Sequence, residues 1–280
     1  MIVKLVKSLD ESLKQRLSSL GFDQFMKFSL DGIGDRGLVM FLMDHIELDP
    51  LRIVVGDKVL PITPEAVRCV LGLPIGGDDL PLVDKKDKCK LQLELRSLVE
   101  KILNFKDICA KTSRNYSSIK SSDTPRWVAE FIASGGFLDG KQVAKFSDDT
   151  RLKFFFICLF NGFLLTTSQA LVSGLDYFYA KDLSSIGKYD WCKAAVDATR
   201  RSVESWKVQC AKGVKTPLIQ GCPAFVMVSI SAFDVLFSLC IIFQYYCMAS
   251  VYSCSIYNVA FHSSLFLFNI FSFVHAYAVQ

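Results

Sequence analysis

The stretch that decides the fold is LRIVVGDKVLPITPEAVRCVLGLPIGG, residues 51–77. Two short apolar runs flank Gly56-Asp57, and such a pair between apolar runs predicts a β-hairpin over 51–62. Thr63-Pro64 comes next: a threonine N-cap with proline at the first helical position predicts a helix that runs to Leu71. The Gly72-Leu-Pro-Ile-Gly-Gly segment ends that helix, since glycine and proline continue one only at a cost.

Helical periodicity surrounds this stretch on both sides. Apolar residues recur every three or four positions, which predicts amphipathic helices. Thr124-Pro125 repeats the threonine-proline start and predicts another helix around Trp127. The segment RLKFFFICLFNGFLL is so apolar that we expect it to run through the centre of the domain. The fold class is therefore mainly α, a multi-helix globular domain with one short β-hairpin near 51–62. The helical segments are 9–20, 37–48, 91–103, 151–165 and 189–208.

The composition of the chain changes abruptly near residue 228. The chain has 280 residues and a formal net charge of +4, with 51% hydrophobic residues, which is enough to form a sizeable core. Beyond Val228 the only charged residue is Asp234. We therefore divide the chain into a helical domain, residues 1–228, and an uncharged hydrophobic tail, residues 229–280, that is helical or disordered.

Two interpretations of the tail stay open. Residues 235–257 and 259–279 are each long enough to span a membrane, which describes a two-span membrane anchor. Phe, Ser, Leu, Cys, Tyr, Ile and Val are also the residues that thymine-rich codons specify, and Val228-Ser229 can be encoded by a splice-donor sequence. We favour the second interpretation, a translated intron. At the other end, the apolar run before Lys7 is too short for a secretory signal, which indicates cytosol or nucleus.

Few residue patterns in the domain point to chemistry. Gly32-Ile-Gly-Asp-Arg-Gly37 matches the glycine pattern of dinucleotide sites, with Asp57 placed as a ribose-binding acid would be. The parallel βαβ units that such a site needs do not follow, so a flexible turn is the preferred interpretation. His45 is expected on a helix surface or at a helix cap. A pairing of His45 with Cys69 for nucleophilic catalysis has no support in the sequence.

The remaining candidates also favour a structural interpretation. The basic run Lys85–Lys90 is read as a solvated loop rather than as a phosphate-binding patch, because acidic residues dilute it. The cysteines and aspartates lack the spacing of metal ligands. The sequence therefore predicts no catalytic, cofactor-binding or metal-binding residues, and no cofactor.

Two blocks of sequence resemble the plant mobile domain family, which is labelled "aminotransferase-like" and is common in transposon-derived plant genes. The first is residues 44–77, from DHIELDP through LGLPIGG, and the second is residues 151–197, which contains the Tyr-Asp-Trp-Cys helix start. The resemblance covers roughly residues 15–222. It implies a link to transposable elements and to nuclear silencing. The "aminotransferase" label is not matched by a recognisable pyridoxal-phosphate site.

The motif residues are interpreted as scaffold, because their types fix backbone geometry and need no ligand. The expected function is thus a non-enzymatic, transposon-related domain that binds protein partners in the nucleus. Binding of nucleic acid is left open. The alternatives are a two-span membrane protein, located through its tail, and a nucleotide-binding enzyme that uses residues 32–37. The scaffold residues are Thr63, Pro64, Gly72, Leu73, Pro74, Gly76, Gly77, Trp191 and Cys192.

Overall fold

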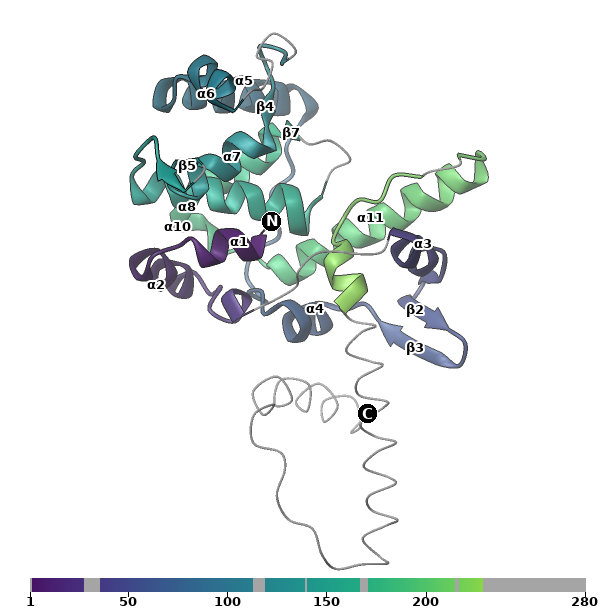
Figure 1. Cartoon of the computed structure of the whole chain (residues 1–280). Coiled ribbons are helices and arrows are strands. Elements are labelled where there is room, and N and C mark those ends of the chain that lie inside the picture. Colours follow the sequence, from purple (N-terminus) through teal and green to yellow (C-terminus); the bar gives the residue numbers. More distant parts are fainter. Residues whose placement is uncertain are drawn as a thin grey trace, which may run out of the picture.

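The computed structural model of the protein describes residues 2–27, 36–112, 119–138, 140–166, 171–214 and 217–228 (Figure 1). These residues form a mainly helical fold with small antiparallel sheets, as the sequence predicts. The helices are α1 (Ile2–Lys7), α2 (Glu11–Ser19), η1 (Phe25–Lys27), α3 (Arg36–Asp44), α4 (Pro64–Leu71), α5 (Lys85–Ile102), α6 (Phe105–Lys111), α7 (Arg126–Ala133), α8 (Asp148–Leu159), η3 (Phe160–Leu164), α9 (Gly174–Ala180), α10 (Leu183–Ile186) and α11 (Trp191–Ala211). The strands are β1 (Ile46–Leu48), β2 (Leu51–Val55), β3 (Lys58–Pro61), β4 (Thr124–Pro125), β5 (Phe137–Leu138), β6 (Lys141–Gln142) and β7 (Leu171–Val172).

The predicted hairpin forms, and it gains a third strand. β2 and β3 pair antiparallel around the Gly56-Asp57 turn, and β1 adds to the other edge of β2. The predicted helix over 37–48 was therefore too long, because α3 ends at Asp44 and Ile46 pairs with Ile53. Pairing with β2 buries Ile46 completely, and this gain outweighs the helical propensity of the segment.

The apolar segment 151–165 runs through the centre of the domain, as predicted. It forms α8, which begins three residues earlier because the Ser147 side chain caps it, and continues as the π-helical turn η3. Every residue from Phe154 to Phe160 is fully buried. α7 and α9 both pack against α8, which makes this helix the axis of the core (Figure 1).

Two local predictions were wrong. Residues 85–90 are exposed as expected but belong to the first turns of α5 rather than to a loop. Thr124–Pro125 does not repeat the cap of α4. These two residues form β4 and pair with β7, so Pro125 precedes the helix α7 instead of opening it. In both places a tertiary contact decides the local structure: α9 packs along α5, and β7 pairs with β4.

The last long helix, α11, begins at Trp191, where the Asp190 side chain accepts a hydrogen bond from the Lys193 N–H. It packs against α4 and α3, above which it runs in the view of Figure 1, and Trp206 donates a hydrogen bond to Asp44 at 2.6 Å. The tail predictions, residues 229–280, lie outside the described residues, as do residues 32–35 of the glycine motif 32–37. Within the ranges given above, no helix combines the length and apolar character needed to cross a membrane.

Candidate functional site

The scaffold residues that follow α4 meet those that begin α11 in one place, while Thr63 and Pro64 lie at the other end of α4. We call this place the motif junction and define it as residues 72–79 together with residues 187–193. The Leu73 carbonyl accepts hydrogen bonds from the Arg68 guanidinium at 2.7 Å and from the Cys192 thiol at 3.4 Å. The next carbonyl, that of Pro74, accepts from the Cys192 backbone N–H at 3.2 Å. The loop after α4 is thereby fixed to the first turn of α11.

Gly77 allows the backbones to come this close, and Gly76 before it adopts a left-handed conformation with φ of 81°. The Gly76 N–H donates to the Asp190 carboxylate at 3.0 Å, and the neighbouring residue Asp78 exchanges backbone hydrogen bonds with Lys188 and Asp190 at 2.8 and 2.9 Å. A Cβ on Gly77 would overlap the Lys188 carbonyl oxygen, so only glycine fits at this position. The junction is thus a short parallel pairing of two backbone segments.

The helix α4 is fixed at both ends. Thr63 accepts a hydrogen bond from the Ala66 N–H at 3.2 Å, and Pro64 occupies the first helical position, as predicted. At the other end Gly72 adopts the left-handed conformation with φ of 66°. Since α4 packs along α11, these caps determine where the loop 72–79 leaves the helix and meets residues 187–193.

Trp191 closes the inner side of the junction. Its indole is fully buried, stacks on Phe160 with ring centroids 4.3 Å apart, and donates a hydrogen bond to the Ile186 carbonyl at 2.8 Å. Burial raises the pKa of the neighbouring Cys192 thiol far above its ordinary value. This thiol therefore stays protonated at neutral pH and acts as a hydrogen-bond donor rather than as a nucleophile.

A second polar cluster, which the sequence analysis missed, lies inside the domain. Asp176 in α9 is buried and accepts hydrogen bonds from the Asn161 side chain at 2.9 Å and from the N–H and hydroxyl of Ser173, both at 2.8 Å. The Asn161 oxygen in turn accepts from Arg126 at 2.6 Å. Ser173-Gly-Leu-Asp176 is a readable capping-box signal, so part of this cluster could have been found.

Burial governs the chemistry of this cluster. Desolvation raises the pKa of Asp176 to about 6, against hydrogen bonds from Ser173 and Asn161 and the charge of Arg126, which lower it. Asn161 lies in η3, the π-helical turn, and also donates to the Leu171 carbonyl at 3.0 Å. The cluster therefore joins η3, α7, α9 and β7, and its members serve to hold these elements together.

Comparison with known proteins identifies a family but not an activity. A family model described as "Domain of unknown function (DUF8566)" matches residues 1–227. The chain belongs to this family. No curated protein matches the chain, and no solved structure matches it.

The other sequence candidates occupy separate places in the DUF8566 domain. His45 follows the last residue of α3, stacks on Phe41 with centroids 4.0 Å apart and lies 2.7 Å from the Phe41 carbonyl oxygen through Nδ1. Gly37 is exposed in the first turn of α3, and Asp57 lies in the β2–β3 turn rather than after a parallel strand. Cys69 lies on α4, where burial raises the pKa of its thiol. In the described part of the chain no three His, Cys, Asp or Glu residues gather as metal ligands would.

Proposed function

We propose that the DUF8566 domain of this chain is a non-enzymatic protein-interaction domain that acts in the nucleus and derives from a transposon-related gene. The nuclear and transposon parts of this proposal rest on the plant mobile domain motifs in residues 44–77 and 151–197. The interaction part rests on one surface feature, exposed apolar side chains on α3 and around the end of α11. The partner we propose is an amphipathic, acidic segment of another protein.

The surface consists of two segments that lie side by side. The Arg36 guanidinium at the start of α3 donates to the Pro217 carbonyl at 3.3 Å, and Asp44 at its end accepts from Trp206. We define the α3–α11 surface by the exposed apolar residues of these segments. Their exposed fractions range from 37% to 52%, and exposed apolar side chains on adjacent segments are informative where single ones are not. They are Leu38, Phe41, Val208, Val214 and Leu218.

The charges beside this surface indicate what kind of partner fits. Arg201 and Lys207 in the last turns of α11 and Lys212 directly after it are exposed; Glu204 and Asp44 are the acidic residues near them, and Asp44 already accepts the hydrogen bond of Trp206. A partner with apolar anchors flanked by carboxylates would pair its charges with the three basic side chains. Charge complementarity of this kind favours association and selects the orientation of the partner. An acidic amphipathic helix presents both features on one face.

The polar groups described above support a non-enzymatic function. At the motif junction, Cys192 and Asp190 are used to join backbone segments. In the buried cluster, Asp176 and Asn161 hold four elements together. Each of these reactive or polar side chains thus has a structural hydrogen-bonding role, and none of these roles requires a substrate.

A binding assay with the full chain tests the proposed interaction. The probe is a fluorescent amphipathic peptide with Leu and Phe anchors flanked by glutamates, and its control replaces the glutamates with lysines. Phe41→Glu places a charge in the α3–α11 surface and should weaken binding at least tenfold, since a buried aromatic anchor is worth about 2 kcal/mol or more. Phe137→Glu, in β5, is the matched control, because Phe137 is also exposed, at 51%.

Fluorescence anisotropy then separates the outcomes. Tight binding of the glutamate peptide alone, lost in Phe41→Glu and kept in Phe137→Glu, supports the proposed surface. Equal effects of the two substitutions, or equal binding of the two peptides, would contradict it. The nuclear part has its own test: a fluorescently tagged full chain that stays out of the nucleus of plant cells would contradict that part.

A further inference from the structure

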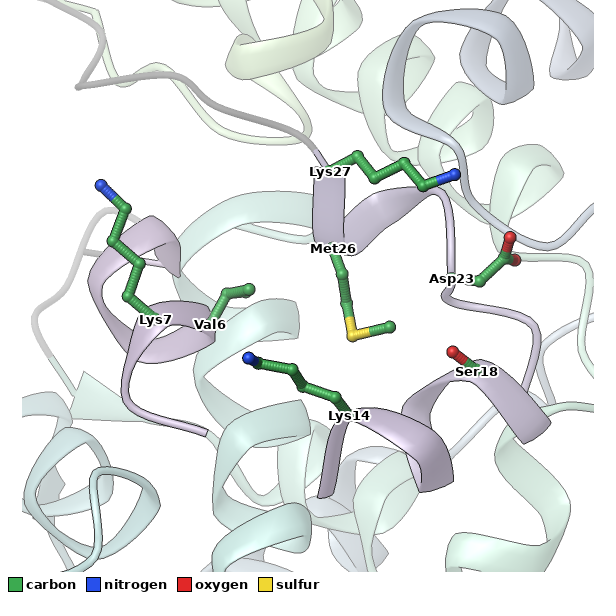
Figure 2. A pocket seen from close by; sticks show the side chains of 7 residues that line it. All are labelled: Val6, Lys7, Lys14, Ser18, Asp23, Met26 and Lys27. Atoms are coloured by element: carbon green, nitrogen blue, oxygen red, sulfur yellow. The ribbon is translucent and has the colours of Figure 1, made fainter. Parts of the chain in front are cut away.

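A hollow of about 440 Å³ lies between the N-terminal helices, away from the features used above (Figure 2). Its walls come from the end of α1, from α2 and from η1 with the residue that leads into it. We call it the N-terminal hollow. Its lining residues are Val6, Lys7, Lys14, Ser18, Asp23, Met26 and Lys27.

Its lining combines cations with an apolar base. Figure 2 shows the Lys14 side chain reaching across the hollow toward Val6, with Met26 above it, while the Lys7 and Lys27 side chains lie at its edge and extend outward in opposite directions. Val6 and Met26 are partly buried and pack on the core. The acidic residue of the lining is Asp23, so three lysines and one aspartate give the lining a formal charge of +2.

The ion pairs already present leave these lysines available to a ligand. Lys14 is bonded to Glu11 at 2.7 Å, but the Glu11 side chain is 79% exposed, and exposed pairs of this kind are weak. Lys27 donates to the Gln24 amide oxygen at 3.3 Å. Because this acceptor is neutral, the contact does not compensate the positive charge of Lys27. The Ser18 hydroxyl lies on the same wall as Lys14 and offers a neutral donor.

We propose that the N-terminal hollow binds a small phosphate monoester that carries an apolar group. A doubly charged phosphate matches the lining charge of +2: the Lys14 ammonium and the Ser18 hydroxyl offer donors to its oxygens, and Lys7 and Lys27 add positive charge at the edge. The volume exceeds what inorganic phosphate fills and falls within the range of about 300–1,000 Å³ that is typical of small-molecule sites. Val6 and Met26 provide the contact for the apolar part of the ligand.

Saturation-transfer NMR with the full chain tests this inference. The probes are phenyl phosphate, inorganic phosphate and phenol, which separate the contributions of charge and ring. Phenyl phosphate should bind with a Kd of the order of 1 mM at low salt, more tightly than either of the other two. Lys14→Gln should weaken it about tenfold, the size expected for losing one charged hydrogen bond. Lys106→Gln, which removes an exposed lysine of α6, is the matched control.

A second variant keeps the test independent of the lysine. Met26→Gln should reduce the advantage of phenyl phosphate over inorganic phosphate while leaving inorganic phosphate binding unchanged. Circular dichroism of each variant checks that the fold is kept. No saturable binding of phenyl phosphate, or equal losses in Lys14→Gln and Lys106→Gln, would overturn the proposal. Since none of these residues lies in the α3–α11 surface, failure here leaves the peptide-binding result unaffected.

Discussion

Replacing Gly72 with alanine probes the close approach that ends α4. The substitution adds one methyl group at a residue with φ of 66°, where its Cβ would lie 2.5 Å from Gln24 Cβ and 2.8 Å from the Phe25 nitrogen. Ordinary contacts between such atoms are about 3.5–4.0 Å, so the backbone of residues 24–25 must move by about 1 Å. Phe25 is buried against Phe22 and Phe163, and the displacement therefore reaches the core.

Gly56→Ala provides the matched control. Gly56 has φ of 64°, almost the same backbone conformation, but nothing lies within 4 Å of the added Cβ. The left-handed conformation costs alanine about 1 kcal/mol at either position. Overpacking adds about 1–3 kcal/mol at Gly72 alone. We therefore expect losses in the free energy of unfolding of about 1 kcal/mol for Gly56→Ala and about 2–4 kcal/mol for Gly72→Ala.

Urea denaturation followed by tryptophan fluorescence measures both losses. Trp191 is fully buried within the motif junction, so its emission reports the unfolding of this region. Equal slopes of the two transitions with respect to urea concentration are needed for the comparison. If Gly72→Ala costs no more than Gly56→Ala, the close packing of the α4 end against residues 24–25 is wrong.

Three further predictions concern single side chains. Thr63→Ala removes the cap that accepts from Ala66 and should cost about 1 kcal/mol in urea denaturation; an unchanged midpoint would contradict the cap. Thr124→Val should stabilise the fold by about 1 kcal/mol, because its buried hydroxyl has no partner within the described residues; a loss would show that the hydroxyl is bonded. Burial raises the pKa of Asp176 to about 6 from 3.8, so the stability that its protonated form provides is complete below about pH 4 and is lost as the pH rises through about 6. Asp176→Asn should remove this change, about 2–3 kcal/mol, from the pH dependence of thermal unfolding, and an unaltered pH profile would contradict the shifted pKa.

The two Thr-Pro pairs show what local sequence can and cannot predict. At Thr63-Pro64 the N-cap and the first helical position were predicted correctly, because both depend on atoms within three residues. The same dipeptide at 124–125 forms a strand, because its backbone pairs with Leu171–Val172. That partner lies far along the chain, and no signal in residues 124–131 indicates it.

The central helix shows the same division. Its unbroken apolar character predicted both the helix and its burial, since only a core position accommodates such a segment. The π-helical turn at its end was not predicted. Its hydrogen bond from Leu165 to the Phe160 carbonyl, at 2.8 Å, has no residue signature. The position of Asn161 beside Asp176 depends on this turn, which is why most of the buried cluster could not be foreseen.

For the motif residues, the sequence predicted the local backbone role of each position, such as a helix cap or a turn. It did not predict that the two blocks contact each other. Caps and left-handed glycines follow from residue type. The bond from the Cys192 thiol to the Leu73 carbonyl joins residues 119 positions apart, and periodicity carries no information at that range. The three-dimensional structure was needed to show that the two blocks form one junction.

The backbone pairing of Asp78 with residues 188–190 has a consequence for how such genes can be rearranged. A truncation that ends anywhere between the two blocks would keep the loop 72–79 but remove residues 188–190, which complete its backbone hydrogen bonds. Neither block is expected to fold without the other, so a rearranged or fused copy of the gene encodes the folded domain only when it contains both blocks. We therefore expect shortened copies that end before Lys188 to be expressed as unfolded, rapidly degraded polypeptides, detectable by limited proteolysis.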